Sequence, residues 1–181
     1  MELILTNQNK SKLFYDLDLL IFLSRDPNLK LMKKLFFLIT LFLFNNAIMA
    51  TTPAKLQHPL EFIFEKVLEK KHLDKKAEIP FPKFFYESKT SLKQFQDAIE
   101  RQWGFRPDVF TNAFAEANNE IYILDDASYY KKTERCMDDS IAHELTHYLQ
   151  VKYQNWDLSD ESLEWEAIDV QTAFRAEFCK I

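Results

Sequence analysis

The spacing of hydrophobic positions predicts four amphipathic helices in the second part of the chain. Apolar side chains there recur three and four positions apart with charged residues between them, as in helices that bury one face. These helices are expected at residues 58–77, at 92–103, from Thr133 through residues 138–151, and from Ser159 to about Phe178. Ser91, Thr133 and Ser159 are expected to cap the last three, because hydroxyl side chains accept hydrogen bonds from the first free N–H groups. Gly104, the only glycine, is expected to end the second helix.

A second pattern, with a period of two, predicts a short sheet. Residues 83–87 are mostly aromatic and favour a strand. Residues 108–125 alternate on both sides of a turn at residues 116–119, which predicts a hairpin, and a loop is expected at residues 125–130. One short sheet among four helices places the chain in the α+β class, as a single domain over residues 51–181.

The first fifty residues follow neither pattern. Residues 1–31 hold one short apolar run, and we expect them to be a non-translated or disordered extension. Residues 32–50 contain two lysines, then ten residues without a charge, and end at Ala50, which is the order of a secretory signal peptide. An apolar run of this length is too short for a bilayer, which takes about 20 residues. The sequence therefore predicts export, with no stable membrane insertion once the signal is removed near Thr51. An amino-terminal membrane anchor is the alternative.

The net charge of the chain limits the classes of partner that it is expected to bind. Residues 51–181 carry 17 Lys and Arg against 24 Asp and Glu, a net charge of −7 with neutral histidines. Nucleic acids and anionic membrane surfaces attract proteins of the opposite sign. We therefore expect neither as a partner.

The only two cysteines are Cys136 and Cys179. In an exported protein they can form a disulfide, and a bridge between them would stabilise the fold by roughly 4 kcal/mol in the chain-entropy model. Two buried thiols, or Cys136 as a zinc ligand, are the alternatives.

The chemistry of the chain centres on the segment His143-Glu144-Leu145-Thr146-His147. This segment lies in a predicted helix without Gly or Pro, so histidines four positions apart project from one face and can reach one ion. Two imidazole nitrogens suit the tetrahedral preference of zinc. Glu144 can stay outside the ligand set and act as general base toward a water that the metal activates. This arrangement is typical of a metallopeptidase with one zinc ion per chain.

A catalytic zinc site needs a third protein ligand and one open position. Glu164 and Glu166, in the predicted last helix, are the two candidates, whereas His58 and His72 lie far upstream and are expected to be solvated. Glu164 shares a helical face with apolar residues and is expected to turn toward the histidines, with Glu166 toward water. The residues expected on the inward face with Glu164 are Ala167, Ile168, Gln171, Phe174 and Phe178.

The histidine motif and the glutamate downstream resemble the gluzincin group of zinc peptidases, over residues 136–180. The resemblance implies a minimal zincin-like domain, in which a short sheet with a hairpin packs against the motif helix and a carboxy-terminal helix supplies the third ligand. The run Glu164-Trp165-Glu166-Ala167 is similar to the Glu-x-x-Ala element of membrane-type members, which favours Glu164. The distance from His147 to Glu166 is similar to that in thermolysin-like enzymes and zinc aminopeptidases, which favours Glu166. We choose Glu164 and keep Glu166 open.

The residues together predict an exported zinc metallopeptidase that hydrolyses peptide or protein substrates. Four tyrosines lie near the motif in sequence and are considered for stabilising the oxyanion, with packing as the alternative for each: Tyr129, Tyr130, Tyr148 and Tyr153. The strand at 121–124 is expected either to pair with an extended substrate or to lie inside the sheet. The rival functions are a non-catalytic exported binding module with a structural zinc site, and a metallohydrolase acting on non-peptide amides.

Overall fold

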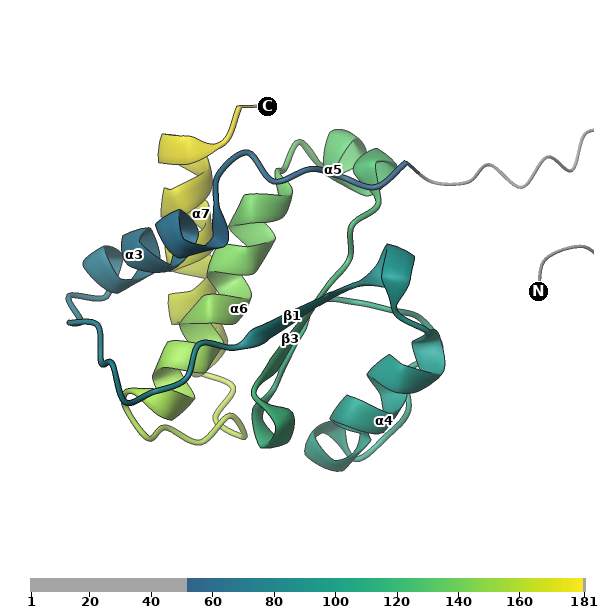
Figure 1. Ribbon diagram of the computed structural model, residues 1–181, viewed down its shortest axis with the longest axis horizontal. Coiled ribbons are helices and arrows are strands. Elements are labelled where there is room, and N and C mark those ends of the chain that lie inside the picture. Colours follow the sequence, from purple (N-terminus) through teal and green to yellow (C-terminus); the bar gives the residue numbers. More distant parts are fainter. Residues whose placement is uncertain (1–51, 181) are drawn as a thin grey trace, which may run out of the picture. The chain divides into compact units, whose positions relative to one another are not determined.

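A computed structural model describes residues 52–180 of the chain (Figure 1). The helices in this range are α3 (Leu60–Lys70), α4 (Leu92–Trp103), α5 (Ala127–Thr133), α6 (Met137–Lys152) and α7 (Leu163–Phe178), and the strands are β1 (Lys83–Tyr86), β2 (Ala113–Ala115) and β3 (Glu120–Ile123). This composition confirms the α+β class. The predictions for residues 1–50 lie outside the described residues. None of the helices between residues 52 and 180 is both long enough and apolar enough to cross a membrane.

The three strands form one mixed sheet in the order β1-β3-β2. β2 and β3 are antiparallel, with Phe114 opposite Ile121, so the predicted hairpin is confirmed. β1 pairs with β3 in parallel, a contact that the period-two pattern did not anticipate. β3 is therefore the interior strand, and β2 is the edge strand on the hairpin side.

Helix α6 lies between the sheet and the helices α3 and α7, and α4 covers the other face of the sheet (Figure 1). Successive side chains of the hairpin point to opposite faces, as the strand period requires. The α6 side of the core includes Phe114, Ile121, Ile123, Ile141, Leu145, Leu149, Val67 and Phe174. The smaller α4 side is formed by Phe95, Ile99, Ala113, Ala115 and Tyr122. Both faces of the sheet are thus buried, which fixes β2 against α6.

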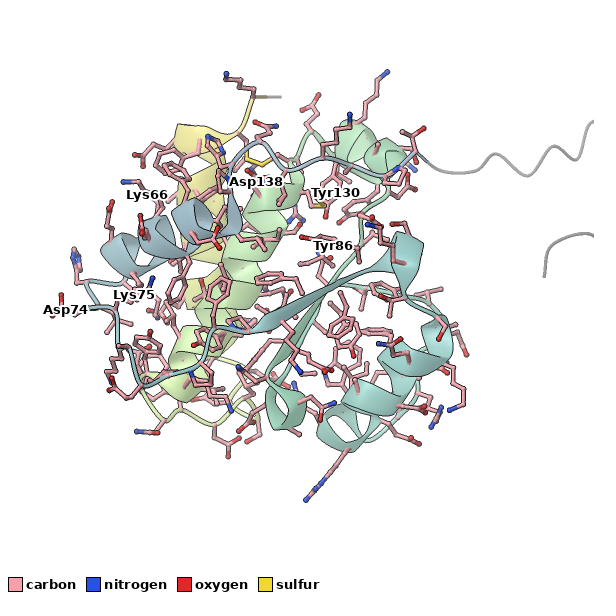
Figure 2. All side chains as sticks on the ribbon, viewed as in Figure 1. Lys66, Asp74, Lys75, Tyr86, Tyr130 and Asp138 are labelled. Carbon is pink, nitrogen blue, oxygen red and sulfur yellow. A yellow bond between two sulfur atoms is a disulfide. The ribbon has the colours of Figure 1, made fainter. Side chains whose placement is uncertain are left out.

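Cys136 and Cys179 form a disulfide, with 5.9 Å between their Cα atoms. It appears as the yellow bond beside the Asp138 label in Figure 2. It joins the start of α6 to the end of α7, so the two helices run antiparallel side by side. The disulfide prediction is confirmed, and Cys136 is therefore neither a free thiol nor a zinc ligand.

The ends of α4 agree with the prediction. The Ser91 hydroxyl accepts a hydrogen bond from the backbone N–H of Gln94, 3.2 Å away, and Gly104 follows the helix with φ 74°. The first helix is shorter than expected, because it ends at Lys70 and His72 takes a left-handed conformation with φ 54°.

The predicted caps of the last two helices are wrong. Thr133 ends the short helix α5 instead of starting α6. The loop expected at 125–130 is helical from Ala127 onward, and the Asp126 side chain caps this helix. α6 starts after Cys136, whose N–H donates to the Asp139 carboxylate. α7 starts at Leu163, not after Ser159, because the carboxylates of residues 157 and 160 accept backbone N–H groups two positions on and hold this segment in turns.

Candidate metal centre

Three predicted ligand atoms converge between α6 and α7. His147 Nε2 lies 3.1 Å from His143 Nε2 and 3.1 Å from Glu164 Oε1, and His143 Nε2 lies 3.4 Å from Glu164 Oε2. One ligand atom from each residue falls within 4.8 Å of the other two. The helix spacing explains the pair of histidines, which project one turn apart from α6. These three residues could hold a single metal ion.

A buried amide fixes the orientation of the His147 ring. Gln150 is fully buried, and its Nε2 donates to the Leu163 carbonyl at 3.0 Å and to Glu166 Oε2 at 2.8 Å. Because both of these partners only accept, the Gln150 oxygen must be the atom 2.8 Å from His147 Nδ1. His147 Nδ1 is therefore the donor, and the neutral ring presents the lone pair of Nε2 toward His143 and Glu164.

Two of the converging atoms, His147 Nε2 and Glu164 Oε1, are acceptors that face each other. With its proton on Nδ1, His147 Nε2 has none to donate to the Glu164 carboxylate. Within residues 52–180, the ion-pair contacts of Glu164 are with the two histidines, and no lysine or arginine reaches its carboxylate. The lone pairs of His147 Nε2 and Glu164 Oε1, 3.1 Å apart, repel unless a cation or a proton lies between them. The arrangement has the donor set and the charge deficit that a cation would complete.

The pKa of His143 is lowered to about 4. Burial is the largest cause, followed by the charge that His147 carries when protonated and by the charge of Arg135, while a hydrogen bond to the backbone of Ala167 opposes the shift. Its Nδ1 is buried and makes no hydrogen bond of good geometry to the described residues, although the Ala167 backbone lies close enough to act on the ring as an acceptor. His143 is therefore neutral near pH 7, which is the form that binds a metal.

Glu144 lies beside this group but outside it. Its side chain is only 5% exposed, and its pKa is raised to about 8 by burial and then by the negative charge of Glu164. A hydrogen bond from the backbone of Phe114 and the charge of Arg135 act in the opposite direction. A cation at the neighbouring lone pairs would favour the ionised carboxylate and lower this pKa.

A cleft of about 740 Å³ opens above these residues. His143, Glu144 and His147 form part of its lining. One wall comes from β2 and the end of α4, and the other from residues 157–161 and the start of α7. Glu164, at the rim, has 56% of its side chain exposed. A ligand in the cleft would therefore reach the histidines and Glu144 together.

Glu166 does not face water as predicted. Its carboxylate contacts Lys71 Nζ at 2.5 Å and accepts from Gln150, so Glu166 is less exposed than Glu164. Ile168, expected on the inward face, is 41% exposed, since the buried stripe of α7 runs through Leu163, Ala167, Val170 and Phe174. The prediction treated α7 as packed only on α6, whereas the end of α3 also packs on it and supplies Lys71.

The remaining predicted groups lie elsewhere. None of the four tyrosines lines the cleft. Tyr148 donates to the Pro80 carbonyl, and Tyr130, labelled in Figure 2, donates to the Leu124 carbonyl. Packing thus accounts for them. His58 is not fully solvated as expected, because its Nδ1 lies 3.0 Å from the buried Asp138 carboxylate, at the disulfide end of α6.

The segment expected at 121–124 belongs to the interior strand β3, which is the second of the two alternatives predicted for it, and the strand beside the cleft is β2. Two outward groups of β2 are already bonded. The Phe114 N–H donates to the Glu144 carboxylate, and the Phe114 carbonyl accepts from Gln102 Nε2 at 3.0 Å.

Gln150, which contacts His147, was not among the predicted site residues. It lies three positions after His147, so helical spacing puts it on the same face of α6. Its signal was a polar amide three positions after a predicted ligand, on a helix buried nearly throughout.

Comparison of this chain with protein-family models, curated proteins and solved structures finds no match.

Proposed function

We propose that this protein is an exported zinc-dependent peptidase whose metal is held by His143, His147 and Glu164. The observation that carries the proposal is the convergence of two imidazole nitrogens and a carboxylate, with no cationic side chain among residues 52–180 to balance them. The resemblance of this motif to gluzincin peptidases points the same way.

The donor set fits zinc in a catalytic role. Two histidines and one glutamate are a common ligand set of catalytic zinc, which keeps a further position open for water or substrate. A structural site would be closed by a fourth protein ligand. Cys136, the residue considered for that role, is bonded to Cys179. This favours an enzyme over a binding module with a structural zinc site.

The chain's own residues account for the proton transfers. When bound, zinc would polarise the substrate carbonyl and make a water nucleophilic near neutral pH. Glu144, held by the Phe114 N–H at the cleft floor, takes the proton of the attacking water and passes it to the leaving amine.

An extended peptide could pair with the β2 side of the cleft only beyond Phe114, whose outward N–H and carbonyl are both bonded within the chain. A peptide that lies along this edge would enter the cleft beside Glu144. Gln102 already occupies the edge at Phe114 and Glu116, which leaves the Asn112 end for pairing.

Export is part of the proposal. It is supported by the signal-like segment at residues 32–50 and by the disulfide, a bond typical of oxidising compartments.

The test is metal analysis together with hydrolysis. We expect purified protein to hold about one zinc per chain, to cleave a mixture of unfolded peptides, and to lose and regain cleavage as zinc is chelated and returned. His147→Ala should lose both zinc and cleavage. Cleavage that survives complete removal of the metal would contradict the proposal.

A further inference from the structure

We infer that an ion pair between the buried Lys71 ammonium and the partly exposed Glu166 carboxylate acts through Gln150 to hold His147 in the orientation and tautomer that bind the metal. These three are positioning residues, since none of them touches the proposed ligand position. The inference rests on the proposed function for its effect on zinc, but its effect on the His147 ring can be tested without metal.

First, two hydrogen bonds hold the Gln150 amide in place. The Leu163 carbonyl and Glu166 Oε2 both accept from its Nε2, at 3.0 and 2.8 Å. If either acceptor were lost, the amide could rotate and present its NH₂ group to His147. The ring would then carry its proton on Nε2, the atom directed at the other two ligands.

The second step is the charge that keeps Glu166 in place. Lys71 is 1% exposed, and its Nζ meets the same Oε2 atom that accepts from Gln150. The Trp156 ring lies 5.4 Å from this Nζ and covers it. A buried ammonium needs an anionic partner, so Lys71 holds the Glu166 carboxylate on the Gln150 side of α7.

The third step is the effect on His147. A carboxylate that accepts from an amide polarises it and makes its oxygen a stronger acceptor for the next N–H in the chain. A stronger acceptor at Nδ1 raises the basicity of Nε2 toward a metal. The His143 Nδ1 makes no hydrogen bond to a side chain within the described residues. The orientation of the site therefore depends on the Lys71–Glu166–Gln150–His147 chain.

The main test is Gln150→Leu, which removes the amide and keeps a side chain of similar size. We expect its affinity for zinc, measured by competition with a chromophoric chelator, to fall by about 10–100-fold. Thr146→Val is the matched control. It removes a buried side-chain hydrogen bond from the same helix, to the Ala142 carbonyl at 2.8 Å, and should keep the wild-type zinc affinity.

Lys71→Met tests the contact that lies farthest from His147 in the Lys71–Glu166–Gln150–His147 series. Methionine can fill the space of the buried lysine stem without its charge. We expect the zinc affinity of this variant to fall, as in Gln150→Leu. Lys70→Met is the control, because the Lys70–Glu177 ion pair, 3.0 Å long, also joins α3 to α7 but does not contact Gln150. It should leave zinc affinity unchanged.

A metal-free measurement separates this inference from the proposed function. Nitrogen-15 NMR of metal-free wild-type protein should show the His147 proton on Nδ1, and Gln150→Leu should lose that preference. If wild-type protein binds no zinc, the proposed function fails while this readout still decides the inference. A wild-type proton on Nε2 would overturn it, as would unchanged zinc affinity in folded Gln150→Leu protein. If that variant does not fold, the wild-type spectrum and Lys71→Met decide.

Discussion

The α6–α7 helix pair carries two clusters of possible metal ligands, one at each end of the contact. One cluster is Cys136, Asp139 and Cys179, and the other is His143, His147 and Glu164. Both bring together residue types that bind metals within the same distance. They differ in whether the protein itself has already satisfied them.

At the disulfide end every group has a partner. The cysteines are bonded to each other, and the fully buried Asp139 carboxylate contacts Arg135 at 2.6 Å, Gln171 at 3.1 Å and Arg175 at 3.8 Å. Its negative charge is thus balanced by protein cations. Nothing at this end requires an ion.

At the histidine end the balance is missing. The two histidine rings and the Glu164 carboxylate face one another, and Lys71, which follows α3, is paired with Glu166 instead. Residue types and proximity alone therefore do not distinguish the two clusters. The cations that the protein supplies at the disulfide end, and not at the histidine end within residues 52–180, do.

The largest effect that sharpens this contrast is expected in Glu164→Ala. Removing one of three ligands should weaken zinc binding by more than the roughly 100-fold that outer partners reach, as measured by chelator competition. Glu161→Ala is a matched control, because Glu161 lines the same cleft outside the ligand group and should keep its zinc. Equal zinc affinity in the two variants would remove Glu164 from the site.

The next largest effect should come from the opposite end. Replacing Cys136 and Cys179 together by serine should lower the free energy of unfolding by about 4 kcal/mol, because the unfolded chain regains the entropy of an open loop. Denaturant unfolding measures the change. Zinc affinity in the folded fraction should stay at the wild-type value. A loss of zinc without a loss of stability would contradict the assignment of stability to the disulfide end and of metal binding to the histidine end.

A smaller effect is expected from pH in the metal-free protein. The pKa of Glu144 rises from 4.5 to about 8 on folding, so the folded state binds more protons than the unfolded state between these values and stability falls as pH rises. The pKa of His143 drops from 6.5 to about 4, so its contribution runs the other way, and the two oppose each other between pH 4.5 and 6.5.

Above pH 6.5 only the Glu144 contribution remains. Metal-free protein should therefore lose roughly 2 kcal/mol of unfolding free energy between pH 6.5 and 8, measured by denaturant unfolding at several pH values. Glu144→Gln should abolish the loss. Saturating zinc should abolish it too, since a cation stabilises the ionised carboxylate; a loss that persists in Glu144→Gln would assign it to another group.

Much of this contrast was accessible from the sequence, because it depended on local patterns. The Ser91 cap and Gly104 predicted the two ends of the helix at 92–103. The period of two predicted the hairpin. The presence of two cysteines in a chain expected to be exported predicted the disulfide.

What the sequence did not yield depended on contacts between distant segments. The parallel pairing of β1 with β3 joins strands that the helix α4 separates, and no local pattern encodes it. The position of Glu166 was mispredicted because Lys71, far upstream, approaches α7 at that point. Glu164 was expected at the histidines because of an apolar face, yet its side chain reaches them from the exposed rim of the cleft.

The most direct measurement of the central claim is the zinc content and peptide hydrolysis of Glu144→Gln beside the wild type. Glu144 is beside the proposed ligands but not among them, so the variant should keep about one zinc per chain. Its hydrolysis rate should fall by roughly 10²–10⁴-fold, the usual contribution of a positioned general base. Bound zinc with an undiminished rate in Glu144→Gln would contradict the account of this site as a metallopeptidase centre.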